Sequence, residues 1–232
     1  MAAAGCKDGS VTLADVKKTL LLKAYENNRG SSVAFIDESY LAPSFSIGTS
    51  APTFYLMTAY VIAVEELEPM RDDLHDLVGG DYWHSTNSHR SPAGQEKIRE
   101  FTSFVGDGDE ALIVALQRPI DSRDSNGEVA RSECWRALLP VLSGGNYCDP
   151  VSLAIFEERK FQKQRNADEM SIKTVRNDGL IPRTMQVCPT SPTYERLLWL
   201  PDVVSFALYQ SYGAVRTDYA QPFADRVIEI AH

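Results

Sequence analysis

The sequence predicts a mixed α/β domain in which about five strands form one sheet and helices pack against it. Two observations support this fold class. Short apolar runs alternate with amphipathic segments along the chain, and Gly, Pro, Ser and Asn clusters separate them. The composition is that of an ordinary globular protein, because 44% of the 232 residues are hydrophobic and 24% are charged. The longest apolar runs, 54–64 and 197–209, are too short and too polar to span a membrane.

Residues 1–30 are predicted to form a helical arm ahead of a main domain at 31–232. Ser10 or Thr12 can cap a helix over 13–26, and 27–30 end it. An apolar stripe on this helix either packs on the main domain or docks a partner protein or a second copy. The stripe consists of Leu13, Val16, Leu20 and either Leu21 or Ala24.

The strands are predicted from their apolar, β-branched and aromatic residues. A loop rich in Pro, Gly, Ser and Thr is expected at 41–53, and the continuously apolar run 111–117 is typical of a central strand. The predicted strands are 32–39, 54–64, 81–86, 111–117 and 151–159.

Helices are predicted between and after these strands. Gly79 closes the first, Ser91 and Pro92 open the second as cap and first residue, and Pro140 disturbs the third. The fourth is entered through Pro201. These predicted helices cover 69–78, 92–105, 128–142, 195–213 and 223–232.

The charge balance limits the classes of partner. The chain has 23 basic and 32 acidic residues, a formal charge of −9, which disfavours nucleic-acid binding over the whole surface but permits a local contact. The N-terminus lacks a basic-then-apolar signal region, so we expect a cytoplasmic protein. Scattered cysteines without a C-x-x-C pair indicate free thiols rather than disulfides or a zinc site: Cys6, Cys134, Cys148 and Cys188.

Acidic residues stand at the ends of three predicted elements. Asp37 and Glu38 follow the first strand, Glu157 and Glu158 end the last one, and Asp202 begins the apolar helix. Side chains alternate along a strand, so only one acid of each adjacent pair can face a given side. Carboxylates that converge from different elements can hold the divalent ions used in phosphodiester cleavage.

Each acid also has a simpler explanation. Asp37 is compatible with the first residue of a loop, and Glu158 with a surface ion pair to Arg159 or Lys160. Asp202 suits the first turn of any helix, where negative charge is favourable. Spacing alone therefore predicts an α/β domain with a candidate acidic site.

Three segments resemble a family of ribonuclease-H-like proteins of unknown function. The string AFIDES at 34–39, followed by the strand at 54–63, is similar to the family's first strand, aromatic-Ile-Asp-Glu-Ser-Gly. The segment LLWLPDVVSFAL resembles its last core helix, in which an Asp follows a Leu- or Trp-rich lead. The segment 155–169 resembles a strand pattern in which an acid and an Arg precede a further Asp, here Asp168. The resemblance covers roughly residues 32–212.

This resemblance implies a three-layer ribonuclease-H-like fold and a nuclease that depends on Mg²⁺ or Mn²⁺. Asp37 would be the ligand shared by two ions, Asp202 and either Glu157 or Glu158 would complete the site, and Glu38 would lie nearby. Glu157 fits the family pattern better, because of its position before the Arg. The metal ligands implied are therefore Asp37, Glu157 and Asp202.

The sequence departs from the family pattern at two places. Tyr40 replaces the usual Gly, and His84 and His89 stand where relatives often place a His and an acid. His84 is a candidate for positioning water or contacting phosphate. Arg159 and Lys160 are candidates for phosphate contact, or part of a solvated loop.

The leading hypothesis from the sequence is a metal-dependent nuclease acting on DNA or RNA. The alternative is a catalytically inactive ribonuclease-H-like scaffold that binds a partner protein, and a third hypothesis is a nuclease that is active only within a complex.

Overall fold

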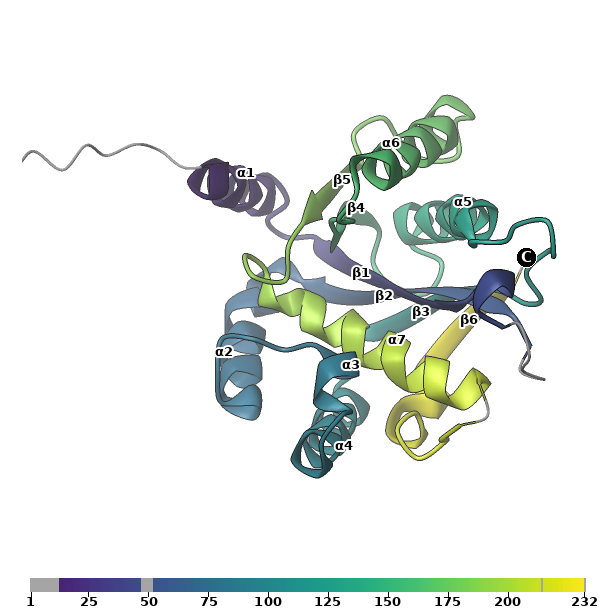
Figure 1. Ribbon diagram of the computed structural model, residues 1–232. Coiled ribbons are helices and arrows are strands. Elements are labelled where there is room, and N and C mark those ends of the chain that lie inside the picture. The colour runs from purple at the N-terminus through teal and green to yellow at the C-terminus, as the bar shows by residue number, and fades with distance from the viewer. Residues whose placement is uncertain (1–12, 47–51, 214, 232) are drawn as a thin grey trace, which may run out of the picture.

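The computed structural model describes residues 13–46, 52–213 and 215–231, and shows a three-layer α/β fold around one mixed sheet (Figure 1). The sheet has six strands in the order β5-β4-β1-β2-β3-β6. Strand β2 runs antiparallel to both of its neighbours, and the remaining pairs are parallel. The strands are β1 (Ser32–Leu41), β2 (Phe54–Ala63), β3 (Ala111–Gln117), β4 (Val151–Glu157), β5 (Gln186–Thr190) and β6 (Val227–Ala231).

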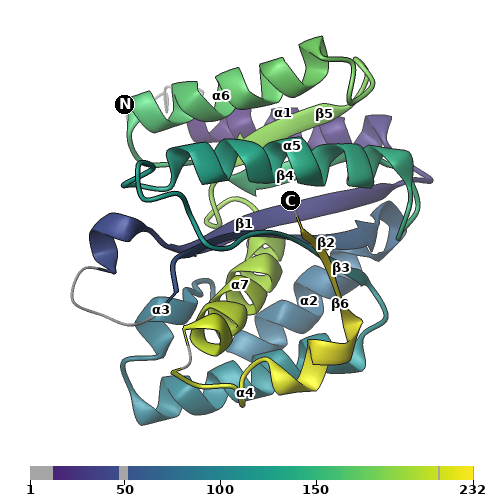
Figure 2. The ribbon, with the colours of Figure 1, turned by 90° about the vertical axis from the view of Figure 1, so that its right-hand side faces the viewer.

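Helices cover both faces of the sheet (Figure 2). On one side, here called the α7 face, α2 (Leu67–Val78), α4 (Pro92–Asp107) and α7 (Trp199–Tyr212) pack on alternate strand residues such as Val33 and Phe35. On the other, the α5 face, α5 (Glu128–Gly144) and α6 (Gln162–Asn177) pack on Ala34 and Ile36. The period-two alternation in β1 thus divides one strand between two cores.

Several predicted boundaries are confirmed. Helix α2 ends at Gly79, which adopts a left-handed backbone with φ of 71°. Helix α4 begins with the Ser91 side chain accepting a hydrogen bond from the Gly94 N–H at 3.1 Å, and Pro92 is its first residue. Helix α5 continues through Pro140 to Gly144, two residues beyond the predicted end. Among the described helices, none is both long and apolar enough to cross a membrane.

The prediction of a strand at 81–86 is wrong. This segment is a loop that leads into the short helix α3 (Ser85–Ser88). Its apolar character comes from Trp83, which packs on Phe101 of α4 with ring centroids 5.0 Å apart. Burial against a helix and burial in a sheet produce the same apolar signal, so the sequence did not distinguish them.

The sheet has six strands rather than about five, because two edge strands were missed and one predicted strand, 81–86, is absent from it. The predicted helix 223–232 is a 3₁₀ turn followed by β6, whose Ile228 and Ile230 pack on the α5 face. Strand β5 is only five residues long and contains Pro189, which is compatible with an edge position. Arg159 and Lys160 lie in the loop between β4 and α6 (Gln162–Asn177).

Helix α1 (Leu13–Asn27) buries only part of the predicted stripe. Val16 and Leu20 are 43% and 61% exposed, whereas Leu21, Ala24 and Tyr25 are buried. The Tyr25 hydroxyl donates a hydrogen bond to Glu195 Oε2 at 2.6 Å, and this contact sets the rotation of the helix. The predicted caps Ser10 and Thr12, as well as Cys6, lie outside the described residues.

Candidate functional site

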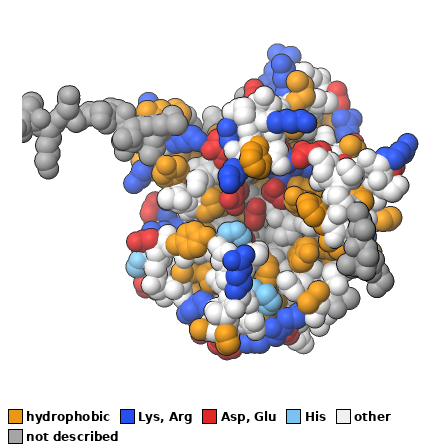
Figure 3. All heavy atoms as spheres, viewed as in Figure 1, with side chains coloured by type: hydrophobic (Ala, Val, Ile, Leu, Met, Phe, Trp, Pro, Cys, Tyr) orange, Lys and Arg blue, Asp and Glu red, His pale blue; other side chains and the backbone are white. Residues whose placement is uncertain are grey.

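A pocket of about 690 Å³ lies where β1 and β4 end and α7 begins. Figure 3 shows acidic side chains beside a hollow near the middle of this face of the molecule. The parallel strands β1 and β4 are neighbours, so both of their C-terminal ends open into the same space. Acidic residues that line the pocket are Asp37, Glu38, Glu157, Glu158 and Asp202.

Three of these acids point to the α7 face. Asp37 follows the alternation of Val33 and Phe35 in β1, and Glu157 follows that of Leu153 and Ile155 in β4. Asp202 reaches the same space from the first turn of α7. The structure therefore brings together the three residues that the resemblance implied as metal ligands.

Glu157, rather than Glu158, is the member of its pair that joins this cluster. Glu158 lies at the pocket's edge, and its Oε2 forms an ion pair with Lys17 Nζ of α1 at 2.6 Å. The preference for Glu157 taken from the family pattern agrees with the alternation of side chains along β4.

The acids perturb one another's ionisation. Burial raises the pKa of Asp37 well above its usual value, and the charges of Glu38, Asp202 and Glu157 add to the increase. Burial, together with Glu38 and Asp202, raises the pKa of Glu157 to about 7. Buried like charges without a counter-charge are costly, and such clusters are typical of functional sites.

Asp202 is held in place by the loop that replaces the predicted strand. Its Oδ2 accepts hydrogen bonds from the Ser85 N–H at 2.9 Å and from the Ser85 hydroxyl at 2.8 Å. The Trp83 indole N–H donates to the same hydroxyl at 3.1 Å. Burial raises the pKa of Asp202, while the Ser85 hydrogen bonds lower it. Sequence reasoning missed Ser85, because nothing local links a loop serine to a helix more than 100 residues away.

His84 lies at the edge of the pocket. Its Nδ1 is 3.9 Å from Asp202 Oδ1, and its side chain is 49% exposed. The position is compatible with the predicted contact to water or phosphate.

Glu38 points to the α5 face, as the alternation predicts, and joins a second, charge-paired cluster. Arg131 of α5 is buried there, with Nη1 2.5 Å from Glu38 Oε1 and Nε 2.5 Å from Asp168 Oδ1. The Arg131 guanidinium also donates to the Tyr55 hydroxyl at 2.7 Å. Arg131 was missed, although an Arg four residues before the buried Trp135 on an apolar helix face was an available signal.

The two residues predicted to contact phosphate, Arg159 and Lys160, differ in whether an acid already pairs with them. The Arg159 guanidinium is paired with Glu128 and lies 3.5 Å from Asp168 Oδ1, so it belongs to the charge-paired cluster. Lys160 is exposed at the pocket wall, with its Nζ 5.8 Å from the centre of the Phe161 ring. Lys160 is therefore the more available cation.

The three pocket carboxylates are candidate ligands for a divalent cation. Carboxylate oxygens are the ligands that Mg²⁺ and Mn²⁺ prefer, and those of Asp37, Glu157 and Asp202 carry unbalanced charge. Over the described ranges 13–46, 52–213 and 215–231, no three His, Cys, Asp or Glu side chains already lie close enough to form a metal cage. The chemistry of the donors thus fits a cation, and binding would require these side chains to draw together.

Comparison with known proteins gives no match for this chain among family models, curated proteins or solved structures.

Proposed function

We propose that the chain is a divalent-metal-dependent phosphodiesterase that acts on DNA or RNA. The observation that carries the proposal is the convergence of Asp37, Glu157 and Asp202 from three elements in one pocket, where pKa values are raised. A cytoplasmic location is part of the proposal and rests on the sequence alone.

The arrangement of the sheet supports a ribonuclease-H-like fold. Three strands that are consecutive in the sheet and in sequence, β1, β2 and β3, form an antiparallel meander, and β4 and β5 follow in parallel on the other side of β1. The first strand is then central, and Asp37 inside it lies beside Glu157 at the end of β4, which fits the first-strand ligand that the resemblance implied.

Residues of this chain have distinct parts in the proposed reaction. Asp37, Glu157 and Asp202 would hold Mg²⁺ or Mn²⁺, which when bound supplies an activated water and stabilises negative charge on the phosphate. Ser85 holds the Asp202 carboxylate in orientation, and Lys160 is placed to contact a phosphate of the substrate.

Cleavage assays with Mg²⁺ or Mn²⁺ on single-stranded, duplex and hybrid substrates test the proposal. We expect Asp37→Asn and Asp202→Asn to lower the cleavage rate by about 100-fold or more, since each removes a ligand charge. The matched control is Asp178→Asn, which removes an acid paired with Arg136 on the surface and should cleave normally. Parent-like cleavage by the two pocket variants would refute the assignment.

The Ser85 hydroxyl gives a second prediction. Ser85→Ala removes one of the two hydrogen bonds to Asp202, so we expect Mn²⁺ affinity, measured by calorimetric titration, to fall by about tenfold. Ser171→Ala removes a hydroxyl that bonds Ser132 and is the control. Equal Mn²⁺ affinity in the parent and both variants would show that Ser85 does not support a metal ligand.

The alternative function is a scaffold that lacks chemistry and binds a partner protein. The absence of a preassembled cage among the described residues and the formal charge of −9 favour it. The same titration separates the two functions, because a scaffold should neither bind Mn²⁺ nor respond to Asp37→Asn.

A further inference from the structure

A second histidine, His89, lines the acidic pocket from the end of α3. Two contacts hold this segment against α7. Ser85 donates a hydrogen bond to Asp202, and the His89 ring packs on Phe206 with 5.3 Å between ring centroids. The two contacts are four residues apart on both segments. Four residues of a helix rise about 6 Å, so the imidazole lies about one turn of α7 from the Asp202 carboxylate.

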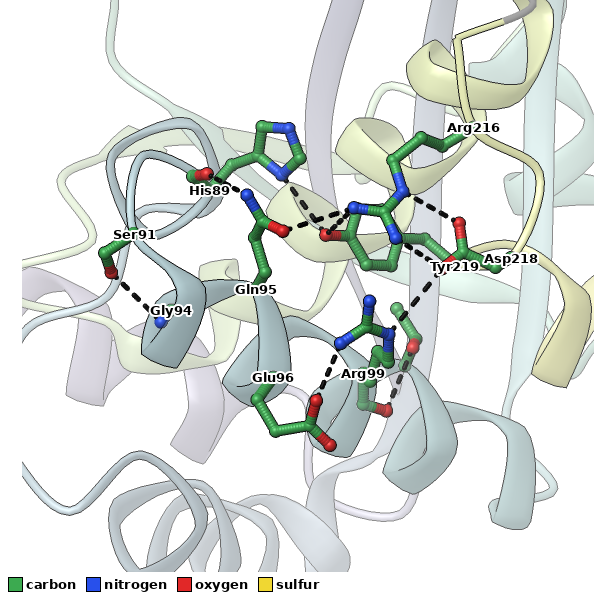
Figure 4. A network of polar contacts seen from close by, with 10 residues as sticks. His89, Ser91, Gly94, Gln95, Glu96, Arg99, Arg216, Asp218 and Tyr219 are labelled. Carbon is green, nitrogen blue, oxygen red and sulfur yellow. Dashed lines mark hydrogen bonds and ion pairs between the residues drawn. The ribbon is translucent and has the colours of Figure 1, made fainter.

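The His89 ring is connected to a buried tyrosine. Its Nδ1 lies 3.2 Å from the Tyr219 hydroxyl, and its other ring nitrogen points away from this network (Figure 4). The same hydroxyl accepts a hydrogen bond from Arg216 Nη1 at 3.2 Å, because a guanidinium can only donate. The phenolic proton can therefore be donated to His89 Nδ1. Burial raises the pKa of Tyr219, which keeps that proton on the phenol.

Several contacts hold the Arg216 guanidinium in place. Arg216 forms two hydrogen bonds with the Asp218 carboxylate, at 3.0 and 2.8 Å, and its guanidinium carbon lies 4.6 Å from the centre of the Tyr219 ring. Gln95 accepts from Arg216 at 3.3 Å and donates to the His89 carbonyl at 3.0 Å. The histidine backbone and the tyrosine hydroxyl are thus held by the same arginine.

We propose that Tyr219 holds His89 in the tautomer that carries its proton on Nε2, and that this N–H donates a hydrogen bond to a phosphate oxygen of the substrate. That the substrate is a nucleic-acid phosphodiester rests on the proposed function. His89 is then a catalytic residue that donates a hydrogen bond without transferring its proton, and Tyr219 is its positioning residue. The pocket acids repel a phosphate, so a hydrogen-bond donor on the same pocket wall helps to orient it.

The tautomer is tested first on the full chain by nitrogen–proton NMR of the imidazole rings, with His89→Gln used to assign the signals. We expect a protonated Nε2 and an unprotonated Nδ1 at His89. Tyr219→Phe keeps the ring but removes the donor, so His89 should shift to a mixture of tautomers. A protonated Nδ1 in the parent, or an unchanged spectrum in Tyr219→Phe, would overturn the proposal for the tyrosine.

The phosphate contact is tested with inorganic phosphate as the probe. The Nε2 signal of His89 should move on titration, whereas that of His75, exposed on α2, should not. A His89 signal that does not respond would overturn the assignment of the donor. This readout needs no cleavage, so it stands apart from failure of the proposed nuclease activity.

Kinetics provide a further readout where cleavage is observed. A hydrogen bond to a charged oxygen corresponds to roughly a 10- to 100-fold effect, so His89→Leu should lower kcat by that factor. His89→Gln restores an N–H donor and should recover part of the loss, and His75→Gln should match the parent. Equal rates for His89→Leu and the parent would contradict the proposal.

Discussion

Replacing Arg131 with Met is expected to lower the free energy of unfolding by about 3–5 kcal/mol, because it leaves buried carboxylates without their counter-charge. Arg131 is 2% exposed and is shared by the carboxylates of Glu38 and Asp168 and by the Tyr55 hydroxyl. Removing it leaves two buried or half-buried carboxylates, with Arg159 3.5 Å from Asp168 as the remaining neighbour. Urea denaturation measures the change.

Helix α5 offers the matched control. Arg136 lies five residues later and pairs with Asp178, but both side chains are 42% exposed. Exposed pairs contribute about 0–1 kcal/mol, so Arg136→Met should have little effect. Adding Asp168→Leu to Arg131→Met should recover part of the lost stability, because it removes an unpaired buried charge. Similar losses for Arg131→Met and Arg136→Met would contradict this account of the cluster.

Replacing Glu157 with Gln is expected to stabilise the metal-free protein at about pH 8 by roughly 2 kcal/mol, allowing for the partial exposure of this side chain. The pKa of Glu157 is raised from 4.5 to about 7, so between these values the folded state holds a proton that the unfolded state has lost. Stability therefore falls as the pH rises through this window. The Gln variant cannot lose that proton and should not show this fall.

The comparison is made by denaturation at about pH 5 and pH 8 without divalent cations. The parent and Glu157→Gln should be similar at the lower pH and differ at the higher one. Glu158→Gln is the matched control, because Glu158 is already paired with Lys17 and the loss of its charge should not stabilise the protein. On the proposed function, Mn²⁺ should stabilise the parent at the higher pH and have less effect on Glu157→Gln. A difference between parent and Glu157→Gln that does not change with pH would contradict the raised pKa.

The candidate site could be predicted only in part. Side-chain alternation predicted that Asp37 and Glu38 face opposite sides of β1, which the structure confirms, and the resemblance implied that Asp37 and Glu157 share one site with Glu38 nearby. The partners of these acids were not predicted. Ser85 is 117 residues from Asp202, and Arg131 is 93 residues from Glu38, so no local pattern connects them.

The edge strand β6 likewise could not be predicted from the local sequence. Strand β6 reads VIEIA, in which Ile228 and Ile230 alternate with Glu229, and so short an apolar run also suits a helix. Its backbone becomes a strand because β3 presents an unpaired edge, and the register of Leu112 with Val227 provides the hydrogen bonds. The secondary structure of so short a segment depends on the backbone hydrogen bonds that its neighbours offer.

The sequence by itself determined the strands of the sheet's centre, the caps of α2 and α4, and the acids carried by β1 and β4, because these depend on local periodicity and backbone preference. Only the tertiary structure decided which residues hold those acids. The Ser85 contact, the Arg131 cluster and the His89–Tyr219 pair all join distant segments, and a buried polar group takes whatever partner the packing brings within hydrogen-bond distance.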